Sequence, residues 1–280
     1  MRKIGQGDKS EVYVLSDGRI LKLFFPHHGS LADVEAHLSG LLARAGVHAP
    51  RVDEIVKVDG RPGIVFGNLR EGQTVSRVVR KRPWRIYGAA RQLAELHAAV
   101  HECSGIELPS QRERIGDQIR ASSELSDEVR HLALGALGDL PDGDAVCHND
   151  VHMLNVIVYP GGGMIIDWVL ATRGNPLADV ATAALQLRFG EQPERVAARW
   201  SLEAGRALFQ RAYLRRYLEL RSCPTRELAR WELPTAVALV GRREGRMRWQ
   251  LVRRVHELVP AEEARRAGGC RTGPSGVDRR

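Results

Sequence analysis

The chain has 280 residues, of which 43% are hydrophobic and 27% are charged, and its formal net charge is +8. This composition is typical of a globular protein, and the length allows either one large domain or two lobes. No hydrophobic run approaches the roughly 18 residues of a membrane span, and the first ten residues lack the hydrophobic stretch of a secretory signal. Four widely spaced cysteines without a C-x-x-C pair disfavour a zinc site. We therefore expect a cytoplasmic protein with reduced thiols and no membrane partner.

A positive net charge can indicate nucleic-acid binding, because clustered arginine and lysine side chains neutralise phosphates. Here the excess is nearly all arginine, spread through the expected helices and mixed with glutamate. Aromatic residues that could stack on bases are not interleaved with these arginines. We therefore expect no nucleic-acid partner, and the sequence gives no expectation for the oligomeric state.

The first 66 residues combine β-favouring segments with one amphipathic helix. Two pairs of these segments flank hairpin turn sequences: residues 11–15 with 19–25, and residues 51–58 with 63–66. Between the pairs, hydrophobic residues recur at helical spacing from Leu31 to Leu42. A sequence like a capping box at Ser30–Asp33 predicts the helix start, and Gly46 predicts its end. We expect a small sheet with one helix laid on it.

Beyond Gly72 the pattern is mainly helical. A long amphipathic helix is expected after Pro83, a residue suited to a helix start. Further helices are expected at 111–122, at 126–138 and from about 178 to 258. The C-terminal segment, residues 261–280, has few hydrophobic side chains to bury. These patterns predict an N-lobe over residues 1–66, a hinge over 67–72, a helical C-lobe over 73–260 and a disordered tail over 261–280.

Polar residues gather in the strand-rich segment CHNDVHMLNVIVYPGGGMIIDW, residues 147–168. A short loop can point Asp150 and Asn155 into the same space, and a second strand after the glycine turn brings Asp167 beside them. Two acids and an amide oxygen suit Mg²⁺, which prefers oxygen ligands shared with substrate phosphates. Phosphoryl transfer needs such a set, because one carboxylate must remain to orient and deprotonate the attacking hydroxyl.

A purely structural alternative is that these residues only cap turns, as Asp and Asn often do. The pattern H-x-D-x-x-x-x-N alone also arises by chance in unrelated chains. The second element, I-I-D-W at residues 165–168, follows at a suitable distance after a strand turn. The two elements together favour the functional interpretation.

Residues near the N-terminus could supply a nucleotide site. Gly5-x-Gly7-x-x-Ser10 is similar to a glycine-rich flap over phosphates, although a simple turn would have the same sequence. Lys22 is a solitary charge in a hydrophobic strand. Such a lysine either faces solvent from an edge or, paired with a helix acid, holds phosphates, and Glu35 is the expected partner.

In this order the residues resemble the aminoglycoside phosphotransferase and choline kinase branch of the protein-kinase-like fold, over about residues 4–258. The resemblance rests on the glycine-rich start, Lys22, a linker near residues 67–69, L-A-E-L-H, H-x-D-x-x-x-x-N, I-D-W and G-N-P-L-A-D at 174–179. It implies a two-lobed α+β fold, with a small antiparallel-sheet N-lobe carrying one helix and a larger, mainly helical C-lobe. It also implies ATP and Mg²⁺ as cofactors.

The resemblance implies roles for individual residues: Asp150 as catalytic base, Asn155 and Asp167 as Mg²⁺ ligands, Lys22 as an ATP contact, and Gly5, Gly7, Ser10, Glu35 and Asn68 as the rest of the nucleotide site. Asp179 is expected to brace the catalytic loop from a helix N-terminus. Relatives usually have H-G-D-x-H-P-x-N, whereas here Asn149 replaces the glycine and Met153 the proline. These departures concern the conformation of the loop. His152 could shape the loop or touch the substrate, and a structural role is favoured.

The expected function is transfer of the γ-phosphate to a hydroxyl of a small molecule: a sugar, amino sugar, antibiotic or amino alcohol. Asp179 follows Asp167 by only twelve positions, which leaves no room for a peptide-binding activation segment. The alternative is a catalytically silent nucleotide-binding regulatory protein of the same fold. Residues 188–257 contain sixteen arginines and eight glutamates, without aspartate or lysine. We therefore expect a neutral, singly charged or anionic acceptor to be preferred over a polycationic aminoglycoside.

Overall fold

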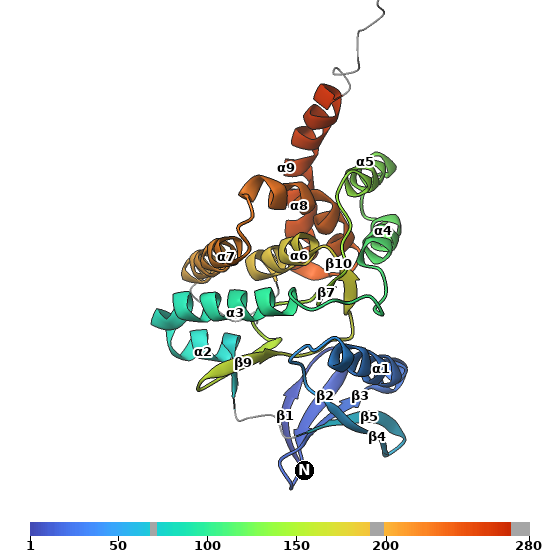
Figure 1. Cartoon of the computed structure of the whole chain (residues 1–280), viewed down its shortest axis with the longest axis vertical. Coiled ribbons are helices and arrows are strands. Elements are labelled where there is room, and N and C mark those ends of the chain that lie inside the picture. The colour runs from blue at the N-terminus through green and yellow to red at the C-terminus, as the bar shows by residue number, and fades with distance from the viewer. Residues whose placement is uncertain (68–71, 191–198, 270–280) are drawn as a thin grey trace, which may run out of the picture.

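The computed structural model describes residues 1–67, 72–190 and 199–269. A small sheet with one helix lies at the bottom of Figure 1, and a larger helical part lies above it. This arrangement confirms the predicted two-lobed α+β fold. None of the helices in the described ranges combines the length and the hydrophobicity that crossing a bilayer requires.

The N-terminal sheet has five antiparallel strands in the order β1-β2-β3-β5-β4. Its strands are β1 (Arg2–Gln6), β2 (Ser10–Val14), β3 (Ile20–Phe24), β4 (Val52–Val58) and β5 (Arg61–Phe66). The predicted hairpins are both present. The turn between β4 and β5 has positive φ at Asp59 (49°) and Gly60 (78°), the backbone of a turn that matches strand twist.

Helix α1 (Leu31–Arg44) packs on this sheet, and Gly46, with a φ of 79°, ends it as predicted. The predicted capping box is wrong, because the side chain of Ser30 makes no cap hydrogen bond. A 3-10 turn at Pro26–His28 leads directly into the helix. Ser30 therefore already has helical φ and ψ (−61° and −20°) rather than the extended backbone that a capping residue needs.

The alternation of side chains along β3 places Lys22 on the helix side of the sheet. Phe24, two positions further along, packs there with Ile64 and with Ala32 of α1. The intervening Leu21 and Leu23 pack on the opposite face. Lys22 is thus directed toward α1 by the strand period alone.

The C-terminal part consists mainly of helices around one hydrophobic core. The helices are α2 (Val75–Lys81), α3 (Ile86–Val100), α4 (Gln111–Ala121), α5 (Asp127–Gly138), α6 (Pro176–Phe189), α7 (Arg199–Arg221), α8 (Thr225–Val240) and α9 (Gly245–Gly269). The expected start at Pro83 is a single 3-10 turn, Pro83–Arg85, that precedes α3. Helix α6 is buried on nearly all sides and packs against both α7 and α8.

The segment between α5 and α6 forms most of two small sheets. One pairs β7 (Ala145–Cys147) with β10 (Thr172–Gly174), and the other has the order β6-β8-β9. Its strands are β6 (Gln73–Thr74), β8 (Val156–Tyr159) and β9 (Gly162–Ile165). The β8–β9 hairpin sets Asn155 beside Ile166, whose N–H donates to the carbonyl of Asn155 at 2.9 Å. This register brings Asp167 next to the loop that precedes β8.

The prediction of a disordered tail from residue 261 is wrong for residues 261–269. Helix α9 continues to Gly269 and projects at the top of Figure 1. Charged side chains rather than hydrophobic burial stabilise this last section. Arg265 and Arg266 both pair with Glu262 one turn earlier and with Asp139 at the end of α5. A prediction based on hydrophobic content could not anticipate these ion pairs. Residues 270–280 lie outside the described residues.

Candidate active site

The loop between β7 and β8 is held by Asp179, near the start of α6. One carboxylate oxygen accepts from the backbone N–H of His148 at 2.5 Å, and the other accepts from the N–H of Asn149 at 2.8 Å. Asp179 is completely buried. These contacts place Asp179 where the sequence predicted it, as a brace for this loop.

Asn149, one of the two departures from the expected loop motif, lies in this braced turn. Its φ of 62° lies in the left-handed region, which asparagine tolerates better than most residues other than glycine. The side chain accepts from Gln111 at 2.9 Å and donates to Leu170 O at 2.9 Å and Thr172 Oγ1 at 2.8 Å. Asparagine therefore keeps the left-handed turn and ties it to α4 and β10.

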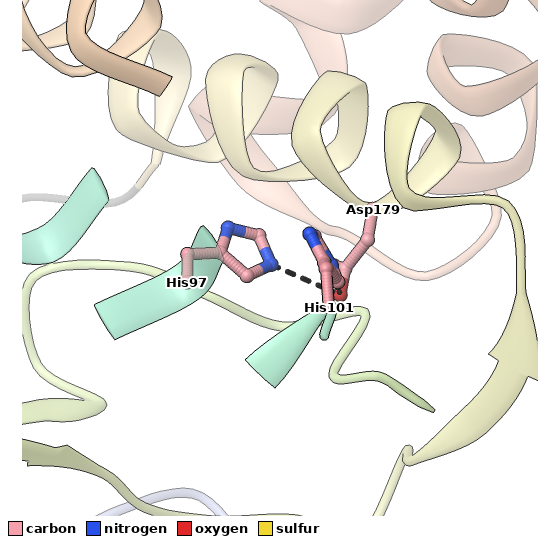
Figure 2. A group of neighbouring side chains, drawn as sticks. All are labelled: His97, His101 and Asp179. Atoms are coloured by element: carbon pink, nitrogen blue, oxygen red, sulfur yellow. Dashed lines mark hydrogen bonds and ion pairs between the residues drawn. The ribbon is translucent and has the colours of Figure 1, made fainter. Parts of the chain in front are cut away.

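Two histidines face Asp179 on its other side (Figure 2), and each of them hydrogen-bonds to a tyrosine. His97 and His101 project from α3 toward Oδ2 of Asp179, and their Nε2 atoms lie 3.1 Å and 3.3 Å from it. The Nδ1 atom of His97 hydrogen-bonds to Tyr213 at 2.8 Å, and that of His101 to Tyr217 at 2.6 Å. For His101 the geometry fits a proton on Nε2, which faces Asp179, with Nδ1 accepting from the hydroxyl of Tyr217.

This buried network is explained without an ion. Both oxygens of Asp179 accept backbone N–H groups, and each imidazole faces the carboxylate on one side and a tyrosine on the other, although Nε2 of His97 makes a close contact rather than a well-aligned hydrogen bond. Burial alone would raise the pKa of Asp179, but His97 and His101 hold it well below its ordinary value. Burial and the neighbouring His97 lower the pKa of His101 to about 4. We interpret the group as a brace rather than a metal site, although its two histidines and one acid resemble a ligand set.

Asp150 follows this braced turn and faces the cleft. Its Oδ1 lies 2.6 Å from Nη2 of Arg243 and 3.6 Å from Nη2 of Arg242. Its Oδ2 lies 3.8 Å from Nε2 of His152. Burial alone would raise the pKa of Asp150, but nearby positive charges, chiefly His152 and Arg243, outweigh burial and lower it. The carboxylate is therefore ionised at neutral pH, the state that can accept a proton.

Asn155 and Asp167 offer hard oxygen donors beside Asp150. The amide nitrogen of Asn155 donates to the backbone carbonyl of Asp150 at 3.0 Å, which orients its amide oxygen away from that bond. Asp167 follows β9. Among the ion pairs of the described residues, Asp167 takes part in one, in which its Oδ1 contacts Lys22. A carboxylate and an amide oxygen are the donors that Mg²⁺ prefers. The predicted metal ligands are thus adjacent and chemically suited to Mg²⁺.

Lys22 joins the sheet part to the helical part. Its Nζ lies 2.7 Å from Glu35 on α1 and 2.8 Å from Asp167. Burial would lower the pKa of Lys22, but the charges of Glu35 and Asp167 outweigh burial and raise it. The structure therefore brings together the lysine and the helix acid that the sequence paired.

The glycine-rich start lies at the mouth of the same cleft. Gly5 pairs with Val12 across β1 and β2, and the N–H of Gly7 donates to the carbonyl of Ser10 at 2.9 Å. A side chain at Gly7 would meet open space, so packing does not require glycine there. Asn68 lies outside the described residues.

The cleft between the two parts has a volume of about 3240 Å³ and is lined by the described candidates Gly5, Gly7, Ser10, Lys22, Glu35, Asp150, Asn155 and Asp167. This exceeds the ~300–1,000 Å³ of a typical single-ligand pocket. It has room for a nucleotide and a second molecule.

Sequence reasoning missed three residues at this site. Arg242 and Arg243 lie in the connection between α8 and α9, and Gln186 lies near the end of α6. The high arginine content of residues 188–257 was visible, but nothing local distinguished these two from the arginines on solvated helix faces.

A sequence profile of the phosphotransferase enzyme family matches residues 1–231. A search of curated protein sequences finds no significant match. Among solved structures, the chain is similar to a thermostable mutant of the aminoglycoside phosphotransferase APH(4)-Ia in a ternary complex with AMP-PNP and hygromycin B. The identity is 15% and the TM-score 0.59, over 98% of this chain and 94% of that chain.

The chain is also similar to the ternary complex of APH(2")-IIa with streptomycin and ATP, at 14% identity and a TM-score of 0.54, over 91% of this chain and 90% of that chain. A choline kinase from Cryptosporidium parvum gives 14% identity and a TM-score of 0.55, over 96% and 90% of the two chains. At these identities the similarity establishes the shared fold.

Proposed function

This chain belongs to the phosphotransferase enzyme family, and from that premise we propose that it transfers the γ-phosphate of ATP, with Mg²⁺, to a hydroxyl of a small molecule. The observation that carries the proposal is the convergence of Asp150, Asn155 and Asp167 on the cleft that Lys22 also lines. These are the groups that phosphoryl transfer requires.

Asp150 is the proposed general base. The acceptor oxygen forms a bond to the γ-phosphorus while the bond from that phosphorus to the β-phosphate oxygen breaks, and the hydroxyl proton passes to a carboxylate oxygen of Asp150. Its lowered pKa keeps the carboxylate ionised. The brace from Asp179 fixes the turn on which Asp150 lies, so the base is positioned before the acceptor arrives.

Lys22 is the proposed contact to the α- and β-phosphates, and Glu35 orients its ammonium group. Asn155 and Asp167 would hold Mg²⁺, which when bound neutralises charge on the phosphates. The second contact of Lys22, to Asp167, keeps that carboxylate beside the phosphate-binding lysine. Gly5, Gly7 and Ser10 would cover the phosphates from the sheet side.

The acceptor is proposed to be a small molecule. Residues 168–175 alone connect Asp167 to α6, which is too short for a peptide-binding segment. Solved structures of this fold contain hygromycin B, streptomycin and gentamicin, and one is a choline kinase. In this chain Arg242 and Arg243 lie beside Asp150, and we expect them to disfavour a polycationic aminoglycoside.

The test is ATP consumption with Mg²⁺ across neutral sugars, sugar acids, sugar phosphates, amino sugars, aminoglycosides and amino alcohols. Asp150→Asn should lower turnover by about 10²–10⁴-fold and leave ATP affinity nearly unchanged, because it removes the base but not the nucleotide contacts. Asp117→Asn on the exposed face of α4 is the matched control and should keep full activity. Full activity of the Asp150 variant would contradict the assignment of the base. ATP binding without consumption across the whole panel would instead favour the silent regulatory protein.

A further inference from the structure

Three arginines line the end of the cleft beyond Asp150, and we call them the arginine cluster: Arg206, Arg242 and Arg243. Arg206 comes from α7, and the other two come from the connection between α8 and α9. Among described residues, the cleft lining from α6, α7 and the α8–α9 connection contains no carboxylate. Asp150 is therefore the acid that faces this cluster.

Asp150 alone does not balance the charge of the cluster. Arg243 contacts Oδ1 of Asp150 at 2.6 Å, and Arg242 is 3.6 Å from the same oxygen. Arg206 is directed to the end of α6, where it donates to the carbonyls of Gln186 at 2.9 Å and Arg188 at 3.0 Å. One carboxylate thus serves two guanidinium groups at the catalytic position.

The environment of Arg242 points to the same excess of positive charge. Burial, together with the nearby Arg243 and Arg114, lowers the pKa of Arg242 to about 10 despite the attraction of Asp150. Arg114 is itself directed to the carbonyl of Leu170 at 2.8 Å. A buried guanidinium in this setting gains from a further anion.

Two buried N–H groups at this site lack a hydrogen-bond acceptor among the described residues. They are Nε of Arg243 and Nε2 of Gln186, a side chain that is 3% exposed. The oxygen of the Gln186 amide accepts from Arg243 at 2.5 Å, so the two groups are adjacent. Leaving such groups without an acceptor is costly, which indicates that an anion or polar ligand completes the site.

We propose that Arg242 and Arg243 bind an anionic group of the phosphate acceptor, either a carboxylate or a phosphate monoester, and that this group draws Arg243 away from Asp150. The inference rests on the proposed function, since it names the substrate class of that enzyme. Its consequence is that the anion both anchors the acceptor and releases the base. A neutral acceptor would leave the base engaged by Arg243.

Binding of simple anions tests the site without any turnover. Inorganic phosphate and acetate are titrated by calorimetry against protein saturated with AMP-PNP, at constant ionic strength set with chloride. Arg242→Gln/Arg243→Gln is compared with Arg211→Gln/Arg253→Gln, which removes the same charge from exposed positions on α7 and α9. We expect the first variant to weaken binding of one or both anions by about 10-fold or more, because a charge-assisted hydrogen bond contributes that much. Equal binding by both variants overturns the proposal.

Kinetics then distinguish the two anion sources. Glucose, glucuronate and glucose 6-phosphate, together with every acceptor active in the screen, are compared by kcat/KM. A preference for the acid indicates a carboxylate, and a preference for the ester indicates a phosphate. The Arg242/Arg243 variant should raise KM for the anionic acceptor by about 10-fold and leave KM for ATP unchanged.

Two results would overturn the anion site while the kinase function stands. One is a preference for a neutral or cationic acceptor, and the other is a variant effect confined to KM for ATP, which would assign the arginines to the nucleotide phosphates. The opposite failure is also distinguishable. Arginine-dependent anion binding by a protein that consumes no ATP would leave the anion site standing and refute the kinase function.

Discussion

Nζ of Lys22 lies 2.8 Å from Oδ1 of Asp167, across 145 positions of the sequence and between the sheet part and the helical part. Glu35 holds the same ammonium group at 2.7 Å. The three residues form a buried to half-buried chain of charges that crosses the cleft. The proposed nucleotide site therefore depends on the relative position of the two parts, because its lysine and its carboxylate come from different parts.

Replacing Lys22 tests the nucleotide side of the cleft. Lys22→Met should weaken ATP binding by about 10-fold or more, because it removes a charge-assisted contact to the phosphates and leaves Glu35 and Asp167 without their cation. Isothermal titration with AMP-PNP measures the effect. Lys57→Met, on the exposed side of β4, is the control and should bind as the unmodified protein does. Equal affinities for the two variants would remove Lys22 from the site.

Asp167 is tested by the metal dependence of nucleotide binding. Asp167→Asn is the better variant than alanine, because the φ of 66° at this position favours Asn over Ala. The variant should weaken AMP-PNP binding with Mg²⁺ several-fold more than binding with EDTA, since it removes a ligand of the ion. If affinity falls equally under both conditions, Asp167 is not a metal ligand.

Asn149 combines a backbone role with a hydrogen-bonding role, and two substitutions separate them. Asn149→Gly keeps the left-handed backbone but loses the side-chain bonds, which should cost at least about 1 kcal/mol of unfolding free energy. Asn149→Ala also places a Cβ at a φ of 62° and should cost a further ~1–2 kcal/mol. Chemical denaturation measures both. An alanine variant as stable as the glycine variant would show that the left-handed backbone is not strained.

The lowered pKa of His101 predicts that the free energy of unfolding falls on mild acidification. Its pKa drops from 6.5 to about 4 on folding, so between these values the unfolded chain binds a proton that the folded chain does not. The free energy of unfolding should therefore decrease as pH falls from 6.5 to 4, by up to about 1.4 kcal/mol per pH unit from this group. Burial lowers the pKa of His148 in the same direction.

The measurement is urea denaturation at pH 7, 6 and 5 for the unmodified protein and for His101→Gln. The glutamine variant will be less stable at every pH, so the slope against pH is compared rather than the stability itself. A shallower slope supports the assignment. An unchanged slope would show that His101 does not contribute to the pH dependence.

The sequence predicted those features that depend on local pattern or on a short spacing. The two N-terminal hairpins and α1 follow from strand alternation, turn residues and helical periodicity. The approach of Asn155 to Asp167 follows from a hairpin of known length. The capping box at Ser30 failed because the preceding 3-10 turn had already given Ser30 a helical backbone.

The remaining features depend on contacts between distant residues. Tyr213 and Tyr217 meet His97 and His101 across 116 positions, and nothing in either helix sequence signals its partner. Arg243 reaches Asp150 across 93 positions. The arginine count alone could suggest a positively charged acceptor site. Only the fold determines which arginines lie beside Asp150.

The two histidine–tyrosine pairs have the same separation in sequence, so α3 and α7 run in the same direction where they pack. Same-direction helices cannot be joined by a short turn, and here a long stretch of the C-terminal part, from α4 through α6, intervenes. The closure of such long loops is slow compared with forming a helix or a hairpin. Asp179 contacts the two histidines of α3 and holds the turn that precedes Asp150. The order of the turn before Asp150 therefore depends on the docking of helices from three separate stretches of the chain, α3, α6 and α7.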